Sequence, residues 1–294
     1  MRISASDDDT TASHMQDSLQ RPPMTPSLRS PRLRLASILR RHRSFFLELA
    51  FVCSCVAIYS VICGLAPVNP HVAFANGQDI LTLERILRIS WEPALNEWLT
   101  KQPLLTDIFS TYYAVSFFLV TAATLIIVWV RRPDRYIYVR NSLLVMTAGA
   151  AVTYWLYPVA PPRLLDGANF VDSVAESSGF GSTYSQMFSV FANPYGAMPS
   201  MHTGWALWAV FALGTFVYRR WWQRLLLALH PVATVMIILM TGNHYLLDAV
   251  AAVGYFAAGA VLATALASSR IPVLSNKPQS LGTVHPQKAS TAIR

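Results

Sequence analysis

The chain has 294 residues, of which 53% are hydrophobic and only 13% are charged, whereas soluble domains carry about 25% charged residues. This apolar content excludes a disordered or fibrous chain, and so few charges would not cover the surface of a soluble protein of this size. The net charge is +8, but the basic residues lie in the gaps between apolar runs, so they indicate a membrane topology and no nucleic-acid partner. The composition therefore predicts an all-α integral membrane protein.

Six segments of the chain are long and apolar enough to cross a bilayer as helices, which takes roughly 20 residues. Pro67 and Pro158 follow the first and the third segment, and Pro231 predicts a kink in the fifth. We expect a six-helix bundle over residues 45–267. The six predicted spans are residues 45–66, 108–130, 141–157, 200–218, 223–241 and 245–267.

Both ends of the chain are polar. Residues 1–44 predict a disordered, basic tail, in which the arginines between positions 29 and 43 lie close to the membrane surface. No signal peptide is visible, because the first apolar run begins only at Phe45. Residues 268–294 predict a second tail without helical signals.

The distribution of Lys and Arg predicts the orientation of the spans. Cytoplasmic termini would place 19 of the 23 Lys and Arg residues in cytoplasmic segments, namely 1–44, 131–140, 219–224 and 268–294. This asymmetry satisfies the positive-inside rule at every loop. We therefore expect both termini in the cytoplasm.

Residues 67–107 form one long external segment in which apolar residues recur at helical spacing. The pattern predicts an amphipathic helix on the outer membrane surface, with Trp91 and Trp98 at the level of the headgroups. The alternative is a lid or a gate through which lipid enters.

Polar residues that could carry chemistry gather at the predicted outer face. Arg163, His202, His244 and Asp248 come from three separate stretches, and ionisable groups in a membrane are costly unless they serve a function. His230 differs, because 14 helical residues place it about 21 Å deeper than His244. We expect His230 to be structural, beside the proline at position 231.

His244 and Asp248 are four residues apart and share a helix face if the helix has already begun there. A carboxylate in this position can accept the Nδ1–H of the imidazole, fix its tautomer and stabilise the imidazolium, which leaves Nε2 as a nucleophile or base. The alternative is a pair that only satisfies its own hydrogen bonds at a helix end.

The segment NPYGAMPSMHTG contains Pro199 and Ser200, which are start signals for a helix. The free amides and the positive dipole end of such a helix form an anion site, to which Ser200 adds a hydroxyl group and His202 an imidazole. A simple capped helix would explain Pro199 and Ser200 but would leave His202 without a role.

Arg163 follows two prolines in APPR, which end the third span and hold the chain extended. Its guanidinium could bind a phosphate in a bidentate manner. Alternatively, the side chain extends to the lipid headgroups.

The three stretches YPVAPPR, GAMPSMHTG and HYLLDAVAA resemble the type 2 phosphatidic acid phosphatase superfamily of membrane enzymes. Among its branches, the chain is most similar to the inositol phosphorylceramide synthase-like phosphotransferases, over about residues 105–267. PSMH and HYLLD, in this order and at these helix ends, carry the resemblance.

The resemblance implies a double displacement through a phosphohistidine, without a metal or a cofactor. By motif, His244 matches the nucleophile, Asp248 the residue that orients it, and His202 the acid that protonates the leaving oxygen. Arg163 and Ser200 match groups that hold the phosphate.

The sequence departs from the phosphatase pattern at two cationic positions. Ile237 and Ile238 stand where the family has a Ser-Arg pair, and Leu156 stands where it has a lysine. A phosphomonoester dianion would be poorly balanced by Arg163, whereas a singly charged phosphodiester needs less positive charge. The sequence therefore favours a phosphodiester donor.

These observations predict a membrane phosphotransferase that moves a phospholipid headgroup, phosphoinositol by the resemblance, to a hydroxyl acceptor. The site would lie on the extracytoplasmic face, and the acceptor and the oligomeric state are left open. One alternative is a lipid or polyprenyl phosphate phosphatase in which water is the acceptor at the same site. A proton-coupled transporter is another, although its relay would cross the bilayer. A zinc hydrolase is a third, since two histidines and an aspartate can ligate zinc.

Overall fold

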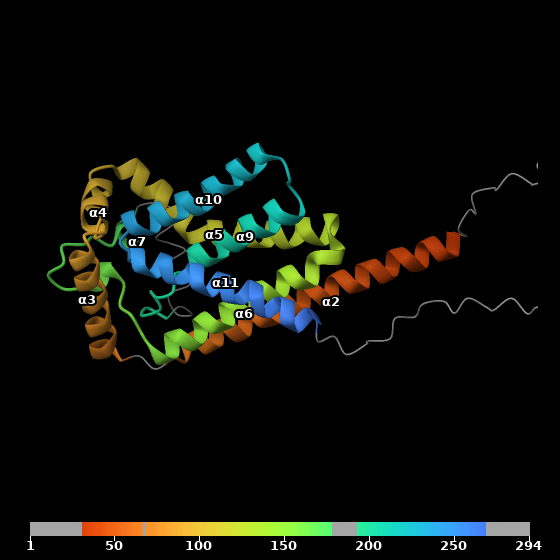
Figure 1. Cartoon of the computed structure of the whole chain (residues 1–294), viewed down its shortest axis with the longest axis horizontal. Coiled ribbons are helices and arrows are strands. Elements are labelled where there is room, and N and C mark those ends of the chain that lie inside the picture. Colours follow the sequence, from red (N-terminus) through yellow and green to blue (C-terminus); the bar gives the residue numbers. More distant parts are fainter. Residues whose placement is uncertain (1–30, 67–68, 178–192, 269–294) are drawn as a thin grey trace, which may run out of the picture. The chain divides into compact units, whose positions relative to one another are not determined.

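The structure, a computed structural model, describes residues 31–66, 69–177 and 193–268 (Figure 1). The described residues are predominantly helical and contain no strand, so the predicted all-α class is confirmed. They belong to two compact units, residues 1–54 and 55–294, and each unit is described by itself. Most of the two predicted polar tails lies outside the described residues.

The helices of the second unit form a bundle with two further helices at one end. Helix α2 (Pro31–Gly64) belongs for most of its length to the first unit. The elements of the second unit that follow it are α3 (Pro70–Leu87), α4 (Glu92–Thr100), α5 (Pro103–Arg131), α6 (Pro133–Leu156), η1 (Pro162–Leu164), α7 (Ser173–Glu176), α9 (Met201–Phe216), α10 (Trp221–Met240) and α11 (Leu246–Ser268).

Helix α2 begins earlier than the sequence pattern predicts. Residues 31–44 are helical, although they were expected to belong to a disordered tail. Pro31 occupies the first helical position, where its fixed φ favours a helix, and the leucines and arginines that follow are good helix formers. Local helix propensity therefore extends the helix beyond the apolar run.

Among the described residues, four helical segments are long and apolar enough to span a membrane, which confirms an integral membrane protein. They are Ser44–Gly64, Pro103–Arg131, Trp221–Met240 and Leu246–Leu266. Two predicted spans do not reach this standard. Helix α9 has 16 residues and is only about 24 Å long, and α6 carries charged residues in its first turns. The count of six spans therefore stays a prediction.

Close packing holds the bundle together. Helix α11 packs along α6, and α9 packs against α5, α10 and α11. A Cβ at Gly259 would lie 2.7 Å from the carbonyl oxygen of Ser142, so only glycine permits this approach of α11 to α6. The indole of Trp208 is fully buried and donates to Val139 O at 2.9 Å, which fastens α9 to α6.

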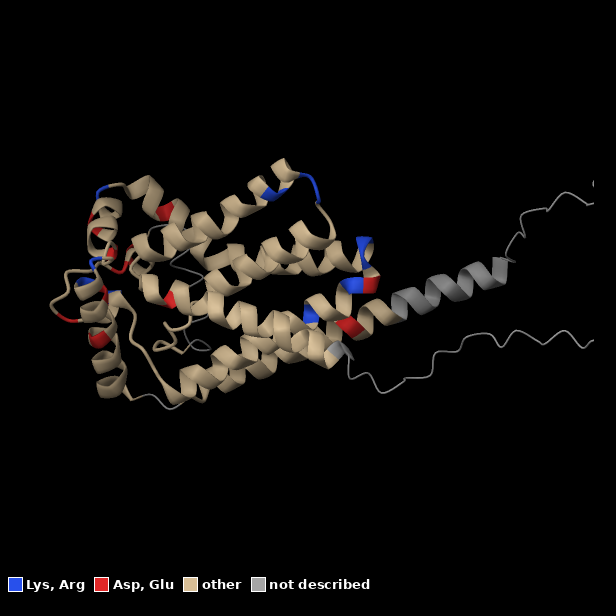
Figure 2. Cartoon of the chain, in the orientation of Figure 1, with Lys and Arg blue, Asp and Glu red and all other residues tan. Residues whose placement is uncertain are grey.

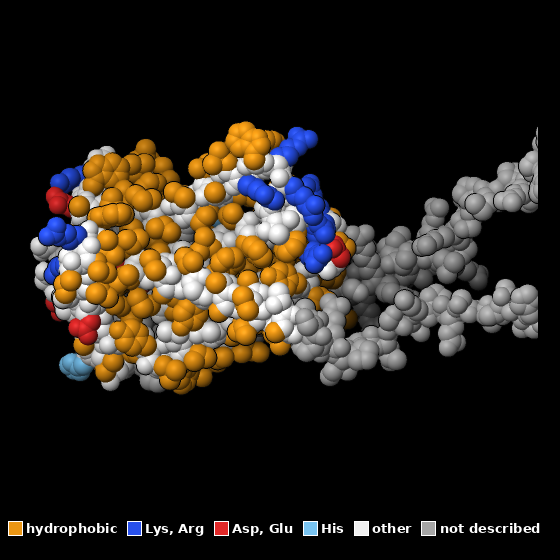
Figure 3. All heavy atoms as spheres, in the orientation of Figure 1, with side chains coloured by type: hydrophobic (Ala, Val, Ile, Leu, Met, Phe, Trp, Pro, Cys, Tyr) orange, Lys and Arg blue, Asp and Glu red, His pale blue; other side chains and the backbone are white. Residues whose placement is uncertain are grey.

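Large apolar side chains cover the outside of the bundle. Figure 3 shows hydrophobic atoms over most of the visible face, with charged side chains at its two ends. Leu119, Val232 and Val261 are each more than 60% exposed, in helices α5, α10 and α11. So extensive an apolar surface is unstable in water and is suited to lipid.

Residues 70–100 form two helices packed on the bundle, where the sequence pattern predicted one amphipathic helix on the outer membrane surface. Helix α3 buries Ala73, Ile80 and Leu81 and contacts η1 and α11, while α4 contacts α10 and α5. The last residues of the predicted segment already belong to α5. Figure 1 shows α3 and α4 at the end of the bundle where α10 leads into α11.

Charged residues gather at the two ends of the bundle (Figure 2). Lys and Arg predominate at the end that holds the α5–α6 and α9–α10 connections, whereas the end with α3 and α4 carries both signs. The predicted orientation of the spans in the membrane depends on this excess of Lys and Arg at one end of the bundle.

Candidate active site

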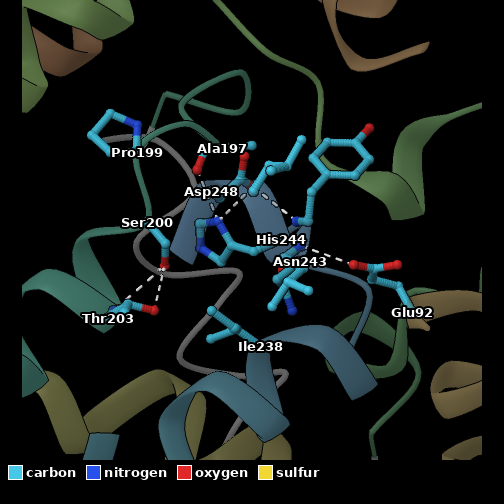
Figure 4. Close-up of polar contacts among 12 residues, drawn as sticks. Glu92, Ala197, Pro199, Ser200, Thr203, Ile238, Asn243, His244 and Asp248 are labelled. Carbon is cyan, nitrogen blue, oxygen red and sulfur yellow. Dashed lines mark hydrogen bonds and ion pairs between the residues drawn. The ribbon is translucent and has the colours of Figure 1, made fainter. Parts of the chain in front are cut away.

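The three stretches singled out in the sequence meet at the N-terminal ends of α9 and α11. Backbone hydrogen bonds join them directly: Ser200 N–H donates to Asp248 O at 3.0 Å, and Arg163 N–H donates to Gly242 O at 2.9 Å. Figure 4 shows His244 beside Ala197 and Asp248. The fold therefore brings the predicted site residues to one place.

His244 lies in the short connection between α10 and α11 and is almost fully buried. Its Nδ1 is 2.9 Å from the carbonyl oxygen of Ala197 and 3.2 Å from Oδ2 of Asp248. Both partners are acceptors, so Nδ1 carries a proton. The Nε2 atom of the neutral ring then has a free lone pair, as a nucleophile requires.

Asp248 lies in the first turn of α11, and its side chain is completely buried. The same oxygen that faces His244 also accepts the N–H of Tyr245 at 2.9 Å. This second bond fixes the carboxylate at the helix N-terminus, where the helix dipole favours a negative charge. The spacing of four residues thus lets Asp248 fix the orientation of the His244 imidazole.

His202 is in the first turn of α9 and faces His244, with ring centroids 5.7 Å apart at an interplanar angle of 62°. Tyr113 stacks on its ring at 4.2 Å, and Phe117 meets it edge-on at 4.5 Å. Its Nε2 is buried and has no hydrogen-bond partner within the described residues. Two aromatic rings therefore fix the imidazole of His202, and one of its ring nitrogens is left without a partner among the described residues.

Ser200 caps α9, as predicted, since its Oγ accepts the N–H of Thr203 at 3.5 Å. The Thr203 hydroxyl group also donates to it, at 3.4 Å. Ser200 is completely buried, and its own hydroxyl proton is left for another acceptor. The cap leaves one hydroxyl donor for a phosphate at this position.

Arg163 is held in the short helix η1, and its Nε donates to Oδ2 of Asp172 at 2.9 Å. Within the part of the chain that is described, its two terminal nitrogens make no hydrogen bond. The backbone bond from Arg163 N–H to Gly242 O places this residue next to the turn that carries His244. Those terminal nitrogens are therefore available to bind a phosphate, as the sequence predicts for Arg163.

Sequence reasoning missed two residues that support Arg163. One is its partner Asp172, and the other is Asn96 of α4, which positions the loop that contains Asp172. The Asn96 side chain accepts from Val171 N–H at 2.8 Å and donates to Val171 O and to Met240 O, at 3.1 and 2.9 Å. It therefore fastens the loop that carries Asp172 to the end of α10. No local pattern indicates this role, because the partners are 75 and 144 residues away.

Sequence reasoning also missed two carboxylates, Glu84 of α3 and Glu92 of α4, which are completely buried at the start of α11. Glu84 shares a helix face with the apolar residues Ile80 and Leu81. A glutamate on the apolar face of an amphipathic helix was the available signal, since such a charge is rarely buried without a purpose.

His230 lies apart from this site. Its Nδ1 is 2.7 Å from the hydroxyl group of Tyr112, and its carbonyl oxygen accepts from the Thr234 hydroxyl group at 2.8 Å. Helix α10 continues through Pro231. These bonds give His230 a structural role between α5 and α10.

Ile237 and Ile238, which replace the Ser-Arg pair of the family pattern, are both buried. The carbonyl oxygen of Ile238 accepts the N–H groups of Asn243 and His244 at 3.1 and 3.3 Å. Ile238 therefore shapes the turn that presents His244, while its side chain adds no charge.

A family model described as the PAP2 superfamily matches residues 78–262. Searches of curated proteins and of solved structures give no match. The matched range covers more than half of the chain and includes all five predicted site residues, Arg163, Ser200, His202, His244 and Asp248. The chain therefore belongs to the PAP2 superfamily, that is, to membrane proteins with phosphatase or phosphotransferase activity.

Proposed function

We propose that this protein is a lipid phosphotransferase that moves a phospholipid headgroup, phosphoinositol by resemblance, to a hydroxyl acceptor through a phosphohistidine. The observation that carries the proposal is the buried His244, whose Nδ1 faces two acceptors while His202 presents an unpartnered Nε2 beside it, as far as the described residues show. One imidazole is thus arranged to attack phosphorus and the other to handle a proton.

In the first step, Nε2 of His244 attacks the phosphorus atom of the donor and forms a P–N bond. The P–O bond to the diacylglycerol breaks, and the leaving oxygen takes a proton from His202, which enters this step as the imidazolium. The imidazolium character that develops on His244 is stabilised by Asp248 and by the carbonyl oxygen of Ala197. Arg163 and the N-terminus of α9 hold the phosphate oxygens.

In the second step, the hydroxyl group of the acceptor attacks the same phosphorus atom. His202, now neutral, takes the hydroxyl proton, and the P–N bond breaks to regenerate His244. The headgroup and its phosphate end on the acceptor. Water in place of the lipid alcohol would release the headgroup phosphate, which is the hydrolase alternative.

The charge of the site favours a phosphodiester as donor. After Arg163, no Lys or Arg occurs before Arg219, and Ile238 is a buried apolar residue where the family pattern has arginine. A phosphodiester carries a single negative charge, which one guanidinium and a helix N-terminus can balance. A phosphomonoester dianion would leave excess negative charge in a buried site.

The test is an assay of the purified full chain in lipid vesicles with phosphatidylinositol labelled in the inositol ring. With a lipid alcohol present, we expect the label to move to a new lipid on thin-layer chromatography, and the EDTA-treated enzyme to retain this activity. Release of water-soluble inositol phosphate alone would favour the hydrolase. Loss with EDTA and recovery with zinc would favour metal catalysis.

We also propose that the site faces the extracytoplasmic side. Reporter fusions at residues 75 and 180 are then expected on the outside and a fusion at residue 135 on the inside, because the Lys and Arg residues gather at the end that holds residues 131–140. The reverse pattern of accessibility would contradict this orientation.

A further inference from the structure

Three carboxylates from three helices bind the first amide groups of α11. Asp248 accepts from Tyr245 N–H at 2.9 Å, Glu92 of α4 accepts from Leu246 N–H at 2.8 Å, and Glu84 of α3 accepts from Leu247 N–H at 2.7 Å. Figure 4 shows Glu92 approaching this turn from a neighbouring element. Helix caps are normally local, but these two glutamates lie 154 and 163 residues away from their partners.

The two capped amides belong to the turn that sets the catalytic geometry. Leu246 and Leu247 lie between His244 and Asp248, so their positions decide how the carboxylate of Asp248 meets the imidazole. A displacement of about 1 Å in such a constellation can cost about 10²-fold in rate. Binding these amides is therefore a way to hold the His–Asp pair.

A close approach of α3 makes the contact possible. A Cβ at Gly77 would lie 2.7 Å from Ala160 O and 2.9 Å from the Tyr245 hydroxyl group, so a larger residue would push α3 away. The Tyr245 hydroxyl group itself donates to Ala160 O at 2.9 Å. Helix α3 is thus fitted against the very turn that Glu84 caps.

Glu84 and Glu92 are both completely buried, and Oε2 of each has no hydrogen-bond partner within the described residues. Burial is the main cause that raises the pKa of Glu84 to about 8, and the nearby charges of Glu92 and Asp248 raise it further. The other ionisable groups around it are the Tyr245 hydroxyl and, on the neighbouring η1, Arg163, which is paired with Asp172. A carboxyl group whose pKa is raised this far keeps its proton at neutral pH, so Glu84 binds Leu247 N–H without adding another buried negative charge beside Glu92 and Asp248.

We propose that Glu84 and Glu92 are positioning residues of the transfer reaction, which together fix the N-terminus of α11 so that Asp248 meets His244. The expected effect of the two glutamates on the reaction rate rests on the proposed function. Their expected effect on the start of α11 rests on the hydrogen bonds alone. It gives the external helices α3 and α4 a role in the chemistry.

The test compares Glu84→Gln and Glu84→Ala with Glu97→Gln, a control on α4 whose side chain is 69% exposed. In Glu84→Gln the new amide oxygen can still accept from Leu247 N–H, and the new NH₂ group can donate to Glu92, so kcat should stay within about threefold of wild type. Alanine leaves the N–H of Leu247 unpaired, and kcat should fall about 10- to 100-fold with KM within about twofold. The control should match wild type.

The pH profile tests whether the proton on Glu84 contributes to the cap. Above about pH 8 Glu84 loses this proton, its negative charge is repelled by Glu92 and Asp248, and kcat should fall. Glutamine cannot ionise, so Glu84→Gln should lose this alkaline decline. If Glu84→Gln is as damaging as alanine, or keeps the decline, the contribution of a protonated Glu84 is refuted.

Hydrogen exchange of the peptide that contains residues 243–249, in the detergent-solubilised full chain, tests the cap without any assay of activity. We expect faster exchange in Glu84→Ala than in wild type and in Glu97→Gln. Unchanged exchange overturns the inference even if the enzyme is active. A wild type that neither transfers nor hydrolyses a headgroup refutes the proposed function, and the exchange result then still decides whether Glu84 caps the helix.

Discussion

His244→Ala is expected to reduce headgroup transfer to the background rate, a loss of about 10⁶ in kcat, as the removal of a catalytic nucleophile does in other covalent enzymes. The variant should fail with every donor, because the P–N bond cannot form. His230→Ala is the control, since His230 is also a hydrogen-bonded histidine of the bundle, although less buried than His244, and lies on α10 away from the site. It should retain most of the wild-type activity.

His202→Ala should behave differently from His244→Ala. The loss of a general acid costs about 10²–10⁴ in rate, and less when the leaving group has a low pKa. A donor with a p-nitrophenol leaving group should therefore restore much of the first step. Acid-labile, base-stable phosphate on the protein should disappear in His244→Ala and accumulate in His202→Ala. If only His202→Ala abolished the labelling, the two roles would have to be exchanged.

Asp248→Asn is expected to lower kcat roughly 10²- to 10³-fold, the usual size of one missing electrostatic contact to a transition state. The oxygen of an asparagine side chain can still accept from His244 and from Tyr245, and Ala197 O also accepts from the same Nδ1. The tautomer is therefore kept, and the loss reflects the missing negative charge opposite the imidazolium. KM for the donor should change little.

Asp248→Ala supplies the comparison for this experiment. It removes the charge and also leaves Tyr245 N–H without its buried acceptor, which costs about 1–3 kcal/mol of stability. We expect a larger loss of kcat and a lower melting temperature than in the asparagine variant. Equal rates for the two variants would show that the charge of Asp248 carries the whole effect and that its orienting hydrogen bonds add nothing to the rate.

The sequence by itself determined the class of the protein and the core of the site. Apolar runs of bilayer length require helices, because lipid offers no partner to backbone N–H and C=O groups. The spacing of His244 and Asp248 and the helix start at Ser200 are local patterns, and the structure reproduces both. Local chemistry was sufficient for these features because each involves residues within one or two turns of a helix.

Only the tertiary structure decided which distant groups support that site. Ala197, 47 residues from His244, supplies a second acceptor for its imidazole, and Asp172 holds the guanidinium of Arg163. Glu84 and Glu92 reach the start of α11 from helices that the sequence pattern assigns to the membrane surface. These contacts depend on how α3, α4 and α11 pack, and packing between residues 154 and 163 positions apart leaves no periodic signal in the chain. The physical reason is that the apolar face of α3 can indicate that Glu84 is buried, but the backbone N–H that Glu84 binds comes from another helix and is known only once the two helices are packed.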